Sequence, residues 1–126
     1  MTDENLEIIL KTISLNGKYI NNKTAMYIET NKYSIKNKYI DQFIVLLDCN
    51  IRVGGLYIMG DFDLHFIIFD NFRGKKYLSN FLRSGFINKI RPTLKKASIC
   101  NKDDSKKIKH LLKLANLKIK KDYNDW

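Results

Sequence analysis

The stretch that decides the fold is FIIFDNFRGKKYLSNFL, residues 66–82. Its first residues complete an apolar run typical of a buried strand, and a short loop with a basic turn follows. The period then changes, because the apolar residues between 76 and 90 recur at helical spacing: Tyr77, Leu78, Phe81, Leu82, Phe86, Ile87 and Ile90. The segment therefore predicts a strand that turns through FRGKK into an amphipathic helix.

The residues before this stretch predict an antiparallel meander. The Gly54-Gly55 pair inside RVGGLYIM indicates a bulge or a close backbone approach. Polar segments at 14–23 and 31–41 are interpreted as loops, with a short helix as the alternative for the second. We predict strands over residues 6–13, 24–29, 43–48, 52–59 and 63–69. A turn at Cys49-Asn50 is expected to join the third of these strands to the fourth.

The residues after this stretch predict a strand, a second helix and a last short strand. Pro92 bars a simple continuation of the first helix. Residues 97–100 (ASIC) read as a strand, and residues 117–122 as another. Between them, Asp103-Asp104 favours a helix start before an apolar face of Ile108, Leu111, Leu112 and Ala115. We expect one α+β domain over residues 1–126, of the three-layer α/β type, with a mixed central sheet.

Charge is divided unevenly along the chain. The whole sequence carries a net charge of +10, from 23 Lys and Arg against 13 Asp and Glu. Residues 1–72 carry −2, residues 73–121 have 16 basic and 2 acidic residues, and the last five residues add −2. One half of the molecule is therefore expected to attract polyanions. The alternative is that many of the lysines reflect codon bias and are simply solvated.

Other features bound the environment of the protein. The N-terminal MTDENLEIIL lacks the basic region of a signal peptide, and the longest apolar run, residues 43–47, is too short to cross a bilayer. We therefore expect a cytoplasmic protein with no membrane partner. Cys49 and Cys100 show no metal-ligand spacing, so we interpret both as small buried hydrophobes and expect no metal. Monomer and homodimer both stay open.

The basic turn is a candidate ligand site. A helix that starts near Lys76 would present unpaired N–H groups and the positive end of its dipole. Arg73, Lys75 and Lys76 add positive side chains at this point, and Gly74 allows a close backbone approach. These features predict a site for a phosphate-rich anion, and the alternative is a solvated loop.

The order of strand, FRGKKYLSNFL, ASIC strand, Asp-capped helix and LLKLANLK resembles the core of the GCN5-related N-acetyltransferase (GNAT) family. The resemblance covers residues 42–118. The family pattern is a strand, then R/Q-x-x-G-x-G/A opening a helix, then a second strand. A helix follows, with an Asn near its start, a Tyr near its end and Gly-Phe after it.

The resemblance implies acetyl-coenzyme A as co-substrate, with its pyrophosphate on the amides of the helix start and its pantetheine alongside the preceding strand. The implied contacts in this sequence are Ile68, Arg73, Gly74, Lys75, Lys76, Tyr77, Leu78 and Ser105. Arg73 and Gly74 fit the first motif. The positions that depart from the pattern are Lys76 and Leu78 for its two glycines, Ser105 for the Asn, Leu112 for the Tyr, and Asn116-Leu117 for Gly-Phe.

Amine acetylation needs a base near the acceptor nitrogen and an acid for the departing thiolate. Asp63 and His65 alternate on one face of the strand that leads into the turn, and histidine titrates near neutral pH. His65 is therefore the candidate base, directly or through water, and a hydrogen-bonded structural histidine is the alternative. His110 and Tyr123 are the nearest titratable candidates for the acid.

Three functions stay open at this point. The first is an N-acetyltransferase that moves the acetyl group of acetyl-CoA to an amine, on an acidic or nucleic-acid-linked acceptor. The second is a small basic module that binds nucleic acid through residues 73–121 without catalysis. The third is a catalytically inactive GNAT-like protein that serves protein contacts.

Overall fold

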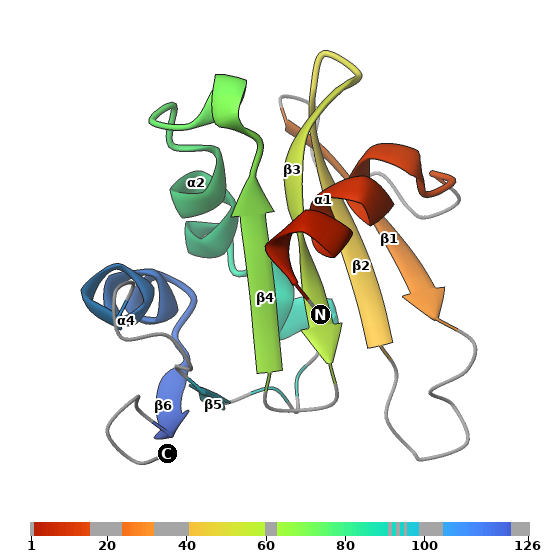
Figure 1. Cartoon of the computed structure of the whole chain (residues 1–126). Helices are drawn as coiled ribbons and strands as arrows, with labels where there is room; N and C mark the ends of the chain where they lie inside the picture. The colour runs from red at the N-terminus through yellow and green to blue at the C-terminus, as the bar shows by residue number, and fades with distance from the viewer. Residues whose placement is uncertain are drawn as a thin grey trace. The chain divides into compact units, whose positions relative to one another are not determined.

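The structure is a computed structural model and describes residues 2–15, 24–31, 41–59, 63–90, 92, 94, 96–98 and 105–121. The chain contains two compact units. The first unit comprises residues 1–59 and 65–77, and the second comprises residues 60–64 and 78–126. Figure 1 shows the helices and strands of both.

A four-stranded sheet forms the centre of the first unit. Its strands lie in the order β1 (Thr24–Asn31), β2 (Asp41–Asp48), β3 (Ile51–Met59) and β4 (Asp63–Ile68). Strands β1 and β2 are antiparallel, as are β2 and β3. The antiparallel meander predicted from the sequence is therefore confirmed for β1–β3, and β4 follows next to β3.

The hairpin between β2 and β3 turns at Cys49 and Asn50, whose φ angles are 49° and 67°. Two consecutive left-handed residues are what a two-residue hairpin loop requires, so the predicted turn is confirmed. Cys49 is exposed at the tip of this turn. The interpretation of Cys49 as a buried hydrophobe was therefore wrong, and Cys100 lies outside the described residues.

The predicted bulge lies where β2 and β3 shift register, between Leu46 and Leu47. Gly54 pairs with Leu46 at this point. A Cβ atom built on Gly54 would lie 2.3 Å from the carbonyl oxygen of Ile67 on β4. A side chain at this position would therefore push β3 and β4 apart, which confirms the close backbone approach expected from the sequence.

Helix α1 (Asp3–Thr12) occupies the residues for which a strand was predicted at 6–13. The Oγ1 of Thr2 accepts a hydrogen bond of 3.1 Å from the Asn5 N–H, which caps the first turn. Two acidic residues in that turn and a lysine in the last complement the helix dipole. The strand prediction was wrong. It relied on the strand propensity of these residues, whereas their apolar side chains recur at the spacing of a helix.

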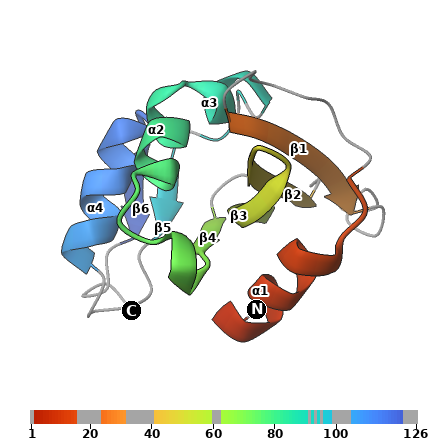
Figure 2. The same ribbon diagram turned by 90° about the horizontal axis from the view of Figure 1, so that it is seen from above.

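Helix α1 lies across the face of β2 and β3, as Figures 1 and 2 show. Its Leu6 and Leu10 are fully buried. They belong to an apolar cluster that also contains Phe43, Val45, Leu47, Tyr57 and Phe69. The alternate residues of β2 and β3 are fully buried too: Ile44, Leu46, Leu56 and Ile58. Strands β2 and β3 are thus buried on both faces.

The second unit contains the remaining helices and strands, α2 (Tyr77–Arg83), α3 (Phe86–Ile90), β5 (Lys96–Ser98), α4 (Ser105–Leu114) and β6 (Lys118–Lys121). The apolar pattern at residues 76–90 predicted one helix, and the structure divides it in two. The division follows from Gly85, whose φ of 74° is left-handed, and from Ser84, whose hydroxyl donates to the Phe81 carbonyl.

Strands β5 and β6 pair in parallel in a sheet of their own, and α4 connects them. Helix α4 ends at Leu114, and Asn116 beyond it is left-handed, with a φ of 57°. The Leu117 N–H donates to the Leu112 carbonyl at 2.9 Å. The combination of helices with an antiparallel sheet confirms the α+β class. A single mixed central sheet is not seen among the described strands, so the family-specific arrangement stays a prediction.

Candidate active site

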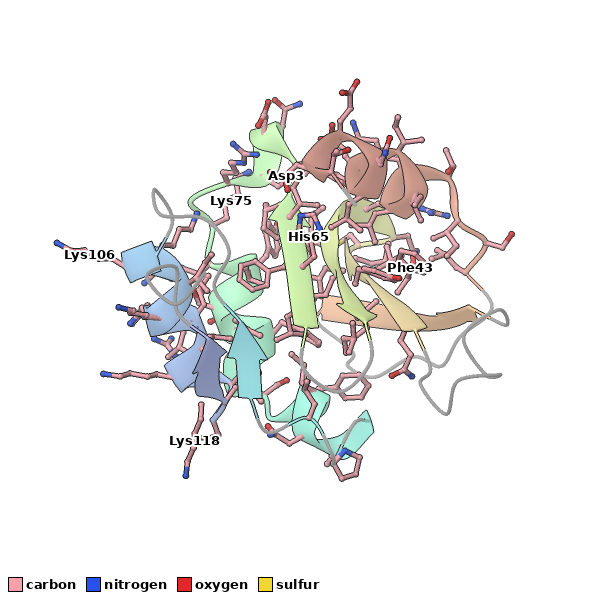
Figure 3. The ribbon with its side chains drawn as sticks, turned by 60° about the horizontal axis from the view of Figure 1, so that its bottom comes forward. Asp3, Phe43, His65, Lys75, Lys106 and Lys118 are labelled. Atoms are coloured by element: carbon pink, nitrogen blue, oxygen red, sulfur yellow. The ribbon has the colours of Figure 1, made fainter. Side chains whose placement is uncertain are left out.

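The predicted base, His65, pairs with a carboxylate from the other end of the sequence. Its Nε2 lies 2.5 Å from Oδ1 of Asp3, in the first turn of α1. Figure 3 shows the two side chains next to each other. The side chain of His65 is 29% exposed and that of Asp3 is 77% exposed. This pair is therefore reachable from solvent and does not belong to the core.

Strand β4 and helix α1 hold the pair in place. On β4, Ile67 and Phe69 lie on the same face as His65 and pack against the cluster under α1. When Nε2 carries the proton, it donates to the Asp3 carboxylate and leaves Nδ1 as an acceptor. A carboxylate that orients an imidazole in this way prepares it to take a proton from a substrate.

The carboxylate partner was not found from the sequence. Asp63 was the neighbour considered, and it only opens β4. The available signal was the helix start at residues 2–4, where a capping threonine precedes two acidic residues. That signal would have placed Asp3 at a helix terminus, but not beside a residue 62 positions later.

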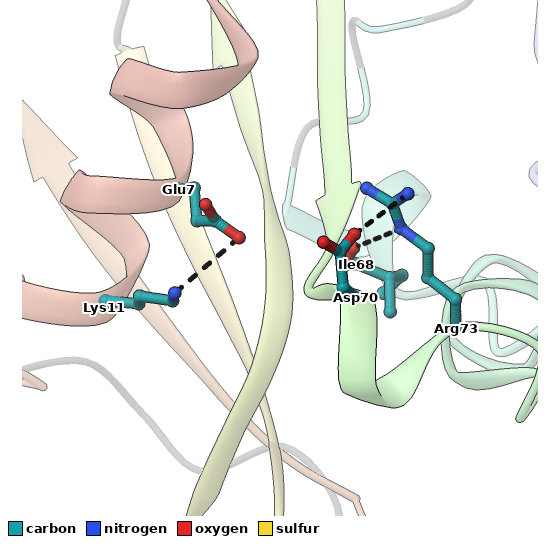
Figure 4. Close-up of polar contacts among 5 residues, drawn as sticks. All are labelled: Glu7, Lys11, Ile68, Asp70 and Arg73. Carbon is teal, nitrogen blue, oxygen red and sulfur yellow. Dashed lines mark hydrogen bonds and ion pairs between the residues drawn. The ribbon is translucent and has the colours of Figure 1, made fainter.

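Arg73 folds back on its own loop (Figure 4). A 3-10 turn, Asp70–Phe72, follows β4. The Arg73 Nε donates to the carbonyl oxygen of Ile68 at 2.9 Å, and its guanidinium lies 3.0 Å from Asp70. These two contacts of Arg73 stabilise the loop, and the Asp70 carboxylate neutralises part of the positive charge of Arg73. Its side chain is still 60% exposed.

The turn from Gly74 to Lys76 is exposed. Gly74 and Lys76 are left-handed, with φ angles of 79° and 63°. No atom lies within 4 Å of a Cβ built on Gly74. The Nζ of Lys75 lies 5.8 Å from the ring centre of Phe72. Neither Lys75 nor Lys76 forms an ion pair within the described part of the chain. A left-handed lysine is strained by about 1–2 kcal/mol.

Tyr77 connects the basic turn to the last residue of β2, next to the β2–β3 turn. Its hydroxyl donates a hydrogen bond of 2.5 Å to Oδ2 of Asp48, and its ring meets Phe72 edge-on at 6.5 Å. The hydrogen bond to Asp48 raises the pKa of Tyr77, and burial and the nearby negative charge add to the rise. Tyr77 therefore has a positioning role at the start of α2.

Because the pKa of Tyr77 is raised in the folded state, its hydrogen bond stabilises the fold while the phenol is protonated. This contribution is complete below a pH of about 10, the ordinary tyrosine value, and is lost as pH rises through the folded-state pKa. Urea denaturation should therefore find Tyr77→Phe less stable than the parent at pH 8, with a difference that shrinks above pH 10. A difference that stays constant up to pH 11 would contradict this prediction.

Two of the predicted contact residues belong to the second unit. Leu78 is 8% exposed, so it is a core residue of α2. Ser105 is the first residue of α4. Of the candidate acids, His110 is exposed on α4 and Tyr123 lies outside the described residues. Leu112 is buried at 2% exposure and supports the packing of α4.

Strand β4 is the last strand of its sheet in the described part of the chain. The Phe69 N–H donates to Val53 on β3 at 2.9 Å. Since backbone groups alternate along a strand, those of Phe66 and Ile68 point to the other edge. Among the described strands, none pairs with this outer edge of β4 in the sheet.

Comparison of the chain with protein-family models, with curated proteins and with solved structures found no match. Within the described residues, no three His, Cys, Asp or Glu side chains gather where they could hold a metal ion. No helix in the described ranges is long and apolar enough to cross a membrane. The candidate site is therefore defined by the contacts of His65 and Asp3 and by the basic turn.

Proposed function

We propose that the protein is an N-acetyltransferase that transfers the acetyl group of acetyl-CoA to an amine. One observation carries this proposal. Strand β4 runs from a partly exposed histidine–carboxylate pair to a cationic, left-handed turn, and no other described strand pairs with its outer edge. The resemblance of the sequence to the GNAT family supports the same assignment.

The co-substrate would lie along this outer edge. An extended ligand with amide groups can pair with the exposed backbone of a terminal strand, as added peptide strands do. Lys75 and Lys76 follow at the end of β4 and would meet the phosphates. Because Asp70 and Ile68 already bind the Arg73 side chain, Arg73 shapes the turn more than it supplies free charge.

His65 would act as the base. In the proposed reaction the acceptor nitrogen forms a bond to the acetyl carbon, and the carbon–sulfur bond of the thioester breaks. The proton of the amine passes to His65, directly or through a water molecule, and the leaving thiolate takes a proton from solvent. Asp3 stabilises the imidazolium that forms.

Acetyl-CoA is expected to stabilise the native state, because a ligand bound only by folded protein shifts unfolding by mass action. At a hundredfold excess over Kd the gain should be roughly 2.7 kcal/mol, measured as a rise in Tm. In Lys75→Gln/Lys76→Gln the rise should be strongly reduced, while the Tm without ligand stays nearly the same. Both side chains are exposed and unpaired within the described residues.

The matched control is Arg83→Gln/Lys89→Gln, which removes two exposed positive charges from the second unit. This variant should keep the full Tm rise. An equal rise in all three proteins would place the co-substrate away from the basic turn. No rise in the parent protein would contradict the acetyltransferase proposal and leave a GNAT-like protein without this activity.

A further inference from the structure

Helix α4 presents a basic face to solvent. Its apolar residues Leu111, Leu112 and Ala115 are buried on one side. Lys106 and Lys113 lie on the opposite side, one turn before and one turn after His110. The exposed basic residues of this face are Lys106, Lys107, His110 and Lys113, and the exposed Lys118 begins β6. We call these five residues the α4 basic face.

In the described part of the chain, no acidic residue forms an ion pair with this face. Residues 105–121 contain seven lysines and no Asp or Glu. Within the described ranges, none of the four lysines of the α4 basic face forms an ion pair. Like charges one turn apart destabilise a helix. A helix face that serves only to contact water is therefore more stable when acidic and basic residues alternate on it. Helix α1 shows such mixing, with Glu7 and Lys11 3.7 Å apart.

We propose that the α4 basic face binds the phosphate backbone of duplex DNA without reading its sequence. Lys106 and Lys113 are seven residues apart, which is about 10 Å along a helix axis. Duplex DNA carries one negative charge for about every 1.7 Å of its axis, so several phosphates fall within that span. Figure 3 shows the side chains of Lys106 and Lys118 extending away from the ribbon.

The chemistry of the face fits a duplex better than a single strand. Between Lys106 and Lys113 the exposed groups are ammonium ions and one imidazole. Single strands are held by aromatic stacking, and duplex RNA is recognised by its shape and by contacts to its 2′-hydroxyls and phosphates. The described exposed residues of this segment include no Phe, Tyr or Trp that could stack on unpaired bases. The phosphates of a duplex are therefore the expected partners, and a B-form duplex presents them densely on its outside.

The test is fluorescence anisotropy with a short labelled DNA duplex, between about 50 and about 200 mM salt. The parent protein should bind at low salt, with log K falling linearly against log salt. Lys106→Gln/Lys113→Gln should make this slope less steep by about 1.8, because each lost duplex contact removes roughly 0.9. Lys107→Gln/Lys118→Gln should have the same effect. Arg83→Gln/Lys89→Gln, with equal charge removed, should keep the parent slope.

Several results would overturn the proposal. These are an absence of binding at low salt, a slope that the two α4 variants leave unchanged, or an equal loss in the Arg83/Lys89 control. Tighter binding of duplex RNA, of the single strand or of polyglutamate would assign the face to another partner. The inference does not rest on acetyl-CoA, since the Tm rise with that ligand reports on Lys75 and Lys76 separately.

Discussion

His65→Gln is expected to lower kcat for any accepted amine by roughly 10²–10⁴-fold, the usual contribution of one positioned base. Glutamine keeps a hydrogen-bonding group near Asp3 but cannot take up a proton at neutral pH. Steady-state rates with acetyl-CoA and a panel of amines would measure this loss. The KM for acetyl-CoA and its Tm rise should stay as in the parent, because the phosphates are expected at Lys75 and Lys76.

Two further variants separate catalysis from a structural role. Asp3→Asn keeps the size of the side chain but removes the charge that stabilises the imidazolium, so kcat should fall by less than in His65→Gln. His110→Gln, on an exposed helix face, should retain the parent rate. Since Asp3 is 77% exposed, the pair contributes about 1 kcal/mol or less to folding stability.

A parent-like kcat in His65→Gln would make this histidine a surface hydrogen-bonding residue. The rate would then depend on substrate positioning and water alone. Loss of rate only in His110→Gln would instead move the acid–base chemistry to α4. Both outcomes contradict the assignment of His65 as the base.

The strands of the meander could be predicted because their signals are local. The run FIVLLD, the Cys49-Asn50 turn and the glycine pair all act within a few residues, and each is confirmed. Helix α4 was predicted from the period of Leu111, Leu112 and Ala115, which are buried as expected. Period and turn chemistry were enough for these elements.

The candidate site could be predicted only in part. The histidine and the basic turn are visible in the sequence, since both belong to one continuous segment. The contact of His65 with Asp3 depends on where α1 lies on the sheet, and no local pattern encodes that position. The pairing of Arg73 with Asp70 and Ile68 was also missed, and it changes Arg73 from a free cation into a brace of the loop.

The strand wrongly predicted for residues 6–13 shows why composition alone misleads. LEIILKTI is rich in isoleucine, which favours strands. Its apolar residues at 6, 9, 10 and 13 nevertheless follow the spacing of an amphipathic helix, and the capped start at Thr2 begins one. The spacing of the apolar residues therefore produced a helix here, although their individual propensities favour a strand.

Leu10→Ala is accordingly expected to reduce the free energy of unfolding by about 2–5 kcal/mol, the range for emptying a fully buried leucine site. Leu10 is 0% exposed within the cluster under α1. Ile8→Ala is the matched control, since Ile8 is 55% exposed on the same helix, and its effect should stay within about 0.5 kcal/mol. Urea denaturation of the three proteins measures both values.

The comparison of these two variants tests the helix itself. In a strand over residues 6–13, Ile8 and Leu10 would share one face, and truncating either would destabilise the protein to a similar degree. In a helix they lie on opposite sides, so only Leu10 reaches the core. Equal losses would contradict α1 and with it the position of Asp3 beside His65. A loss confined to Leu10→Ala would support α1 and with it the place of Asp3 in the first turn of a helix.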